Sequence, residues 1–80
     1  MDDKEIHSHI EELVAEEHRL LEKSEAGGLV PAEHQRLAAI NVQLDRYYDL
    51  LRQRRARREF GQPVESAEMR SGDVVERYLQ

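Results

Sequence analysis

Apolar side chains recur at helical spacing through the first part of the chain. Steps of four, three and seven residues separate the positions of this first stripe, which are Ile6, Ile10, Leu13 and Leu20. Residues at such steps share one face of a helix, so the spacing predicts an amphipathic helix. Asp2 or Asp3 suits the N-cap, and Gly27 and Gly28 suit the end, because glycine takes the left-handed cap conformation at little cost.

A second apolar stripe follows, with spacings of three and four. It consists of Leu37, Ile40, Leu44, Tyr47 and Leu51, and its next two positions are Arg54 and Arg58. Pro31 suits the first turn of this second helix, because the N–H that proline lacks would have no partner there. Val30 is a poor N-cap, so we expect apolar packing of Leu29 or Val30 to fix the junction. The helix is expected to run to about Phe60 and to stop at Gly61.

Two long helices with a short connection are expected to lie antiparallel, as a helical hairpin. Pairing across the turn places Ile6 near Leu51 and Met1 near Arg55. The second helix then overhangs the first. Its arginines are expected to lie beside the acidic residues of the amino terminus.

The last part of the chain begins as a loop and ends in a short helical pattern. Ser71 can cap a final helix that carries Val74, Val75, Tyr78 and Leu79 on one side. The chain is therefore read as all-α, with a helical hairpin at residues 1–61. Residues 62–80 form a C-terminal segment that packs on the hairpin or on a partner subunit.

A two-helix unit leaves part of its apolar surface exposed. We therefore expect a homodimer in which two hairpins form a four-helix bundle, with both apolar stripes as the seams between hairpins. The alternative is that the final helix caps its own hairpin, and a monomer then becomes tenable.

Composition narrows the class of protein. The chain has 80 residues, of which 36% are charged, a net charge of −5 at pH 7 and no cysteine. Neither a disulfide nor a cysteine-based metal site can supplement a core of this size. The acidic start lacks the apolar segment of a signal peptide, and no apolar run is long enough to span a membrane. We expect a soluble, cytoplasmic protein.

Five arginines stand close together near the end of the second helix. They are Arg52, Arg54, Arg55, Arg57 and Arg58. The favoured interpretation is a charge-matched end, lying beside the acidic amino terminus and tail, that a protein partner recognises. The alternative is a nucleic-acid accessory protein that contacts phosphates through these arginines. We consider nucleic acid the weaker alternative, because the rest of the chain is acidic and would repel it.

Other chemistry has little support in the sequence. Four histidines are present, His7, His9, His18 and His34, but no Glu-x-x-His pair of the kind used in di-iron bundles. We expect no metal site and no cofactor. The chain has neither a nucleophile with an adjacent base nor a glycine-rich phosphate loop, so we expect no enzymatic activity.

Four segments carry a resemblance to a known family. They are Ile6–Ile10, Glu16–Leu20, Asp49–Ala56 and Val75–Leu79. Through them the chain resembles a family of short bacterial proteins catalogued as domain-of-unknown-function family 2630. Two positions are atypical for that family: Tyr48 stands where tryptophan is expected, and Val30 where an aspartate N-cap is expected. The resemblance implies a small cytosolic helical protein and brings no activity, cofactor or substrate with it.

Overall fold

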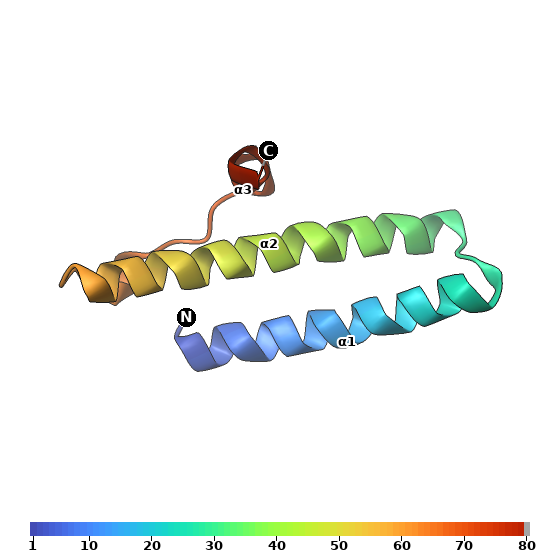
Figure 1. Cartoon of the computed structure of the whole chain (residues 1–80), viewed down its shortest axis with the longest axis horizontal. Helices are drawn as coiled ribbons and strands as arrows, with labels where there is room; N and C mark the ends of the chain where they lie inside the picture. Colours follow the sequence, from blue (N-terminus) through green and yellow to red (C-terminus); the bar gives the residue numbers. More distant parts are fainter. Residues whose placement is uncertain (80) are drawn as a thin grey trace.

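Two long antiparallel helices form the body of the molecule (Figure 1). The computed structural model describes the backbone of residues 1–79 and the side chains of residues 1–77. Helix α1 spans Asp3–Gly27 and helix α2 spans Pro31–Glu59. A 3-10 turn, η1 (Val64–Ser66), and a short helix, α3 (Gly72–Leu79), follow. The predicted all-α hairpin with a short final helix is confirmed.

Helix α1 begins with a capping box. The Glu5 backbone N–H donates to Asp2 Oδ1 at 2.8 Å, and the Asp2 N–H donates to Glu5 Oε1 at 3.4 Å. The two side chains thereby satisfy backbone donors that have no partner inside the helix. The helix ends at Gly28, whose φ of 91° requires glycine and whose N–H donates to the Ser24 carbonyl.

The start of α2 depends on a polar contact instead of the apolar packing predicted for Val30. Val30 is 56% exposed and makes no side-chain cap. Its N–H donates to the Glu33 carboxylate at 3.0 Å, and the same carboxylate pairs with Lys23 Nζ at 2.6 Å. Glu33 therefore joins the end of α1 to the start of α2, while Leu29 beside it is half-buried. The prediction failed for Val30 because a carboxylate at the third helical position can cap a backbone N–H whatever the N-cap residue is.

The apolar core lies between α1 and α2. Its buried members are Ile6, Ile10, Ile40, Leu44 and Leu50. Leu13, Leu20, Tyr47 and Leu51 are half-buried and pack against them, and Leu37 is also half-buried. The predicted stripes thus face each other within one hairpin. Leu50 was not predicted, because it stands beside the main stripe of α2.

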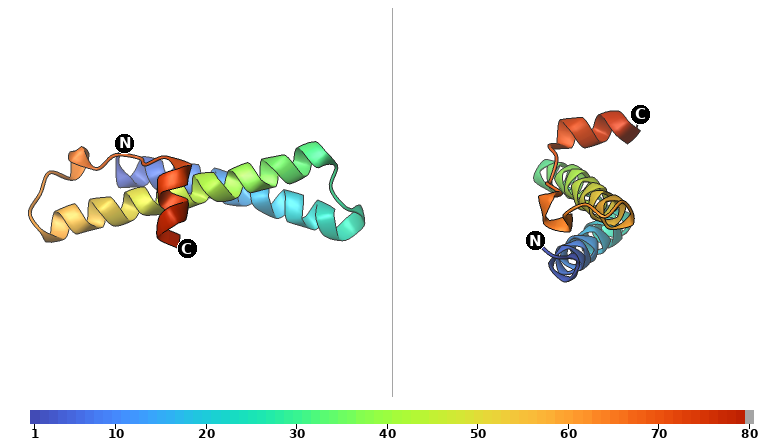
Figure 2. Two further views of the ribbon diagram at one scale, coloured as in Figure 1. Left: turned by 90° about the horizontal axis from the view of Figure 1, so that it is seen from above. Right: turned by 90° about the vertical axis from the view of Figure 1, so that its left-hand side faces the viewer.

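The C-terminal segment returns along α2 on a different face from α1. Figure 1 shows it passing behind α2, and Figure 2 shows α1 and α3 on opposite sides of α2. Arg46 Nε donates to the Arg70 carbonyl at 2.8 Å, and Gln53 Nε2 donates to the Glu68 carbonyl at 2.7 Å. Val75 of α3 is fully buried. The segment therefore packs on its own hairpin.

Gly72 lies at the point where α3 meets α2. A Cβ atom built on Gly72 would stand 2.7 Å from Val42 Cγ1, a distance that forces one of the two to move. A Cβ built on Gly27 would have no heavy atom within 4 Å, so Gly27 offers a matched control.

We expect Gly72→Ala to loosen α3 from α2, because overpacking a close contact costs about 1 kcal/mol or more. Hydrogen exchange measured by mass spectrometry should show faster exchange across residues 72–77 and no change in α1. Gly27→Ala should leave the tail unchanged, and Val42→Ala combined with Gly72→Ala should restore protection. Equal protection in Gly72→Ala and the original chain would contradict the tight contact.

Candidate interaction surface

The arginine-rich end of α2 projects beyond the amino terminus of α1 (Figure 1). The overhang follows from the pairing register, because Asp3 at the start of α1 lies opposite Arg54 and Arg58 while α2 continues to Glu59. Lys23–Glu33 and Glu16–Arg36 pairs hold the same register along the hairpin. The predicted overhang beside the acidic amino terminus is therefore present.

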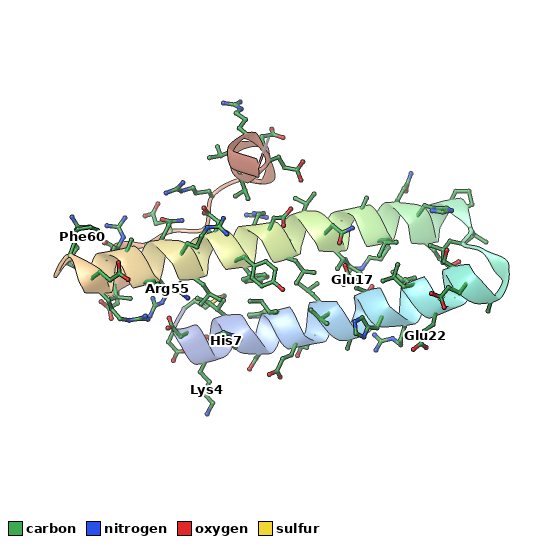
Figure 3. The ribbon with its side chains drawn as sticks, viewed as in Figure 1. Lys4, His7, Glu17, Glu22, Arg55 and Phe60 are labelled. Atoms are coloured by element: carbon green, nitrogen blue, oxygen red, sulfur yellow. The ribbon has the colours of Figure 1, made fainter. Side chains whose placement is uncertain are left out.

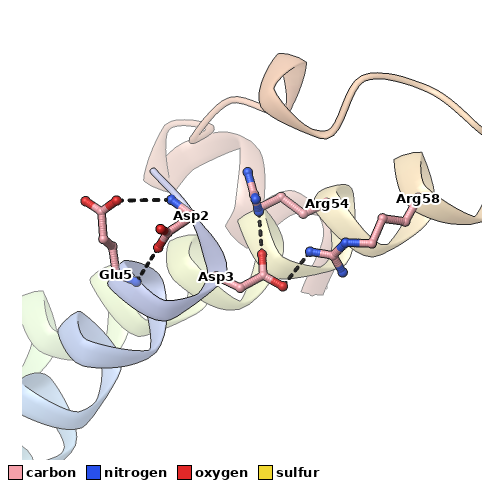
Figure 4. Close-up of polar contacts among 5 residues, drawn as sticks. All are labelled: Asp2, Asp3, Glu5, Arg54 and Arg58. Atoms are coloured by element: carbon pink, nitrogen blue, oxygen red, sulfur yellow. Dashed lines mark hydrogen bonds and ion pairs between the residues drawn. The ribbon is translucent and has the colours of Figure 1, made fainter.

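Asp3 holds two of the five arginines (Figure 4). Arg54 Nε donates to Asp3 Oδ1 and Arg58 Nη2 donates to Asp3 Oδ2, each at 2.5 Å. Arg54 is only 8% exposed, so its guanidinium depends on this carboxylate for a charge partner. The Arg54 hydrogen bond lowers the pKa of Asp3, and Arg58 adds to the effect, against a smaller opposing effect of burial.

Asp49 is the buried carboxylate on the tail-facing side of α2, with 5% exposure. It accepts a hydrogen bond from Gln53 Nε2 at 2.9 Å and lies 3.6 Å from Arg70 Nε and 3.8 Å from Arg52 Nη2. Arg52 therefore balances a buried charge while most of its side chain stays in solvent. The burial of Asp49 was not predicted. A signal was available: Val42, Arg46, Asp49 and Gln53 repeat at steps of four, three and four.

The remaining two arginines differ in their surroundings. Arg57 is half-buried, and within the described side chains its Nε has no hydrogen-bond partner. Arg55 is exposed and makes no ion pair or hydrogen bond in the part of the chain that the structure describes. Phe60, which caps the end of α2, is 78% exposed (Figure 3). The end of α2 thus presents a free guanidinium and an uncovered aromatic ring.

The histidines are dispersed along the hairpin. His9 stacks on Tyr47, with ring centroids 5.3 Å apart and ring planes 8° apart. This contact was not predicted, and it borders an open pocket of about 310 Å³ that Glu16 and Arg36 also line. Among residues 1–79 no group of three or more His, Cys, Asp or Glu side chains is placed to hold a metal ion. None of the helices described is both long enough and apolar enough to cross a membrane.

Fold and surface together define a small all-α hairpin protein with a charge-matched end. The chain belongs to the family described as "Protein of unknown function (DUF2630)", whose profile matches residues 2–80. The resemblance seen in the sequence is confirmed. Uncharacterized proteins of Mycobacterium tuberculosis and Mycobacterium bovis are each 44% identical to it over 77 residues, which cover 95% of this chain and 88% of the relative. No solved structure matches the chain.

We expect Asp3→Asn to lower stability by about 1 kcal/mol near neutral pH, because it leaves a nearly buried guanidinium without its countercharge. The pKa of Asp3 is lowered in the folded state from its ordinary value of 3.8. Its stabilisation is therefore present above that pH and is lost as the pH falls through the lower folded-state value. Urea denaturation of both proteins at several pH values measures the difference.

Glu12→Gln provides the matched control. It removes one carboxylate charge from the same helix, at an exposed position with no ion pair in the described part of the chain. Its effect should be small at every pH tested. An Asp3→Asn effect of constant size from pH 7 to below 3.8 would contradict the assigned role of the ionised carboxylate.

Proposed function

We propose that this protein is an interaction module whose overhanging α2 end docks an acidic surface of another protein. The observation that carries the proposal is that the last turns of α2 expose both Phe60 and Arg55, and Arg55 has no ion pair or hydrogen bond among the described residues. Aromatic side chains and arginine are the residues that most often supply binding energy at protein interfaces. The proposed role includes no catalysis and no cofactor.

The way the end of α2 is fixed supports the proposal. Arg54 and Arg58 form ion pairs with Asp3, so the last turns of α2 are held to α1. A side chain on a held helix loses less freedom on binding than one on a mobile loop. Binding a partner through Arg55 and Phe60 would therefore cost little conformational entropy of the backbone.

Charge favours an acidic protein partner over nucleic acid. The chain carries a net charge of −5, and two of its five clustered arginines are already neutralised in part by Asp3. Binding to a phosphate backbone strengthens with many cations spread along a surface, whereas a protein partner can bind through one guanidinium and one aromatic ring. Nucleic acid is the alternative partner, and Arg52, Arg55 and Arg57 would then contact its phosphates.

We expect Arg55→Glu to abolish partner binding without changing helicity, because it reverses an exposed charge that supports no internal contact. Arg54→Glu is unsuitable, because it would place a buried carboxylate against Asp3. The measurement is affinity capture from native cells with purified chain as bait, quantified by mass spectrometry, with circular dichroism for the fold. Proteins retained by the original chain should fall about tenfold or more in the Arg55→Glu and Phe60→Ala captures.

Lys4→Glu is the control for net charge. Lys4 is exposed and points away from α2 (Figure 3). The Lys4→Glu substitution changes the net charge by the same amount as Arg55→Glu, and this variant should still capture the same proteins. Equal loss in both variants would trace binding to net charge alone and overturn the proposed surface. A gel shift with a 20-nucleotide RNA tests the alternative, which requires binding that weakens steeply with salt.

A further inference from the structure

One flank of the hairpin is left uncovered by the rest of the described chain. Relative to Ile10, the half-buried Leu13 and Leu20 lie on one side of α1, whereas Val14 and Leu21 lie on the other. The first side borders the pocket with Glu16 and Arg36. The second side is not the tail-facing side, because the tail contacts Arg46 and Gln53, on the face of α2 away from α1.

The uncovered flank carries an apolar stripe from both helices, which we call the open flank. Its members are Val14, Leu21, Leu37, Tyr48 and Leu51, around the buried Leu44. Leu21 is 44% exposed and Tyr48 40% exposed, while Val14, Leu37 and Leu51 are half-buried. The open flank keeps Leu37 and Leu51 of the predicted dimer seam, whose isoleucines are buried inside the hairpin.

The molecule exposes more surface than its mass requires. Its accessible surface is 5739 Å² for 9.4 kDa. The scaling relation for folded monomers gives about 5000 Å² for that mass. The radius of gyration is 14.9 Å, against about 11.6 Å for a compact domain of this length. The excess of roughly 700 Å² approaches the ~800 Å² that each partner contributes to a standard interface.

The spacing of the stripe makes the open flank complementary to itself. Val14 stands midway between His7 and Leu21, and Leu44 stands midway between Leu37 and Leu51, each at steps of seven. A two-fold axis through the layer of Val14 and Leu44 would place Leu37 of one copy against Leu51 of the other. Val14 would meet Val14 on the axis, beside the buried Leu44. Isologous contacts of this kind are what a two-fold dimer requires.

Charges at the two ends of the open flank also match under this axis. Arg55 and Glu33 lie at opposite ends of α2, each eleven positions from Leu44. Reversal by the two-fold axis therefore brings Glu33 of one copy opposite Arg55 of the other. Opposite charges meet at both ends of α2, which favours this orientation over its reverse.

We propose that a second copy of this chain covers the open flank, with the two-fold axis at the layer of Val14 and Leu44. The resulting dimer is an antiparallel four-helix bundle in which α1 packs on α1 and α2 on α2 of the second copy. This interface shares only Arg55, at its edge, with the proposed docking end and does not include Phe60, so substitutions at Phe60 test the two proposals separately.

Sedimentation velocity over a range of concentrations tests the dimer. The full chain should sediment at twice 9.4 kDa at high concentration. Leu21→Glu combined with Tyr48→Glu should weaken dimerisation by about a hundredfold or more, because a carboxylate would be buried without a partner. Both positions are exposed in the single chain, so circular dichroism should show unchanged helicity. Phe60→Glu should remain dimeric, which separates this proposal from the docking end.

Cysteine cross-linking tests the axis, because the chain has no cysteine of its own. Val14→Cys lies on the proposed axis and should give a covalent dimer on mild oxidation. Leu21→Cys should cross-link poorly alone but well when mixed with His7→Cys, whereas Glu12→Cys, on the far side of α1, should not. A wild-type monomer at all concentrations would overturn the proposal, as would efficient cross-linking of Leu21→Cys with itself.

Discussion

The packing of Ile6 and Ile10 against Ile40 and Leu44 is the contact on which the rest of the structure depends. It fixes the register between α1 and α2, and the register decides which charges meet. Because Asp3 then falls beside Arg54, a nearly buried guanidinium receives a carboxylate and α2 is left to overhang. If the helices slipped by one turn, Arg54 and Asp3 would no longer meet, and this ion pair would be lost. Apolar packing and ion pairing therefore select the same register.

Helix α2 is shared between two unlike interfaces. Toward α1 it presents an apolar stripe, and toward the tail it presents Arg46, Asp49 and Gln53. The difference follows from what each neighbour offers. Helix α1 satisfies its own backbone groups, whereas the extended residues that precede α3 leave carbonyls that need donors. Arg46 and Gln53 supply those donors, which explains why a helix face with three polar side chains is largely buried.

The hairpin could be predicted from the sequence, and the face of α2 that the tail covers could not. Ile6, Ile10, Ile40 and Leu44 repeat at helical steps, and such repetition in two adjacent segments indicates both elements and the faces that meet. Leu50 and Asp49 stand outside that main stripe. Their burial depends on a segment without a periodic pattern of its own, so only the folded chain reveals it.

The arginine run was also predicted only in part. Sequence indicated an end matched to nearby acids, and Asp3 fulfils this for Arg54 and Arg58. Which arginine would be left unpaired depends on side-chain direction around the helix and on how far the tail reaches. Arg55 has no ion pair or hydrogen bond among the described residues, because α2 extends past the amino terminus of α1 at this point.

The pairing of Asp3 with Arg54 has a consequence for the order in which this protein is assembled. The two residues are 51 positions apart, so the acidic turn leaves the ribosome well before the arginines that hold it. During synthesis α1 has its capping box but none of its apolar partners from α2. A nascent chain therefore exposes Ile6 and Ile10 until most of the second helix has emerged. The first turn of α1 is therefore synthesised long before Arg54 and Arg58, which later hold it to α2.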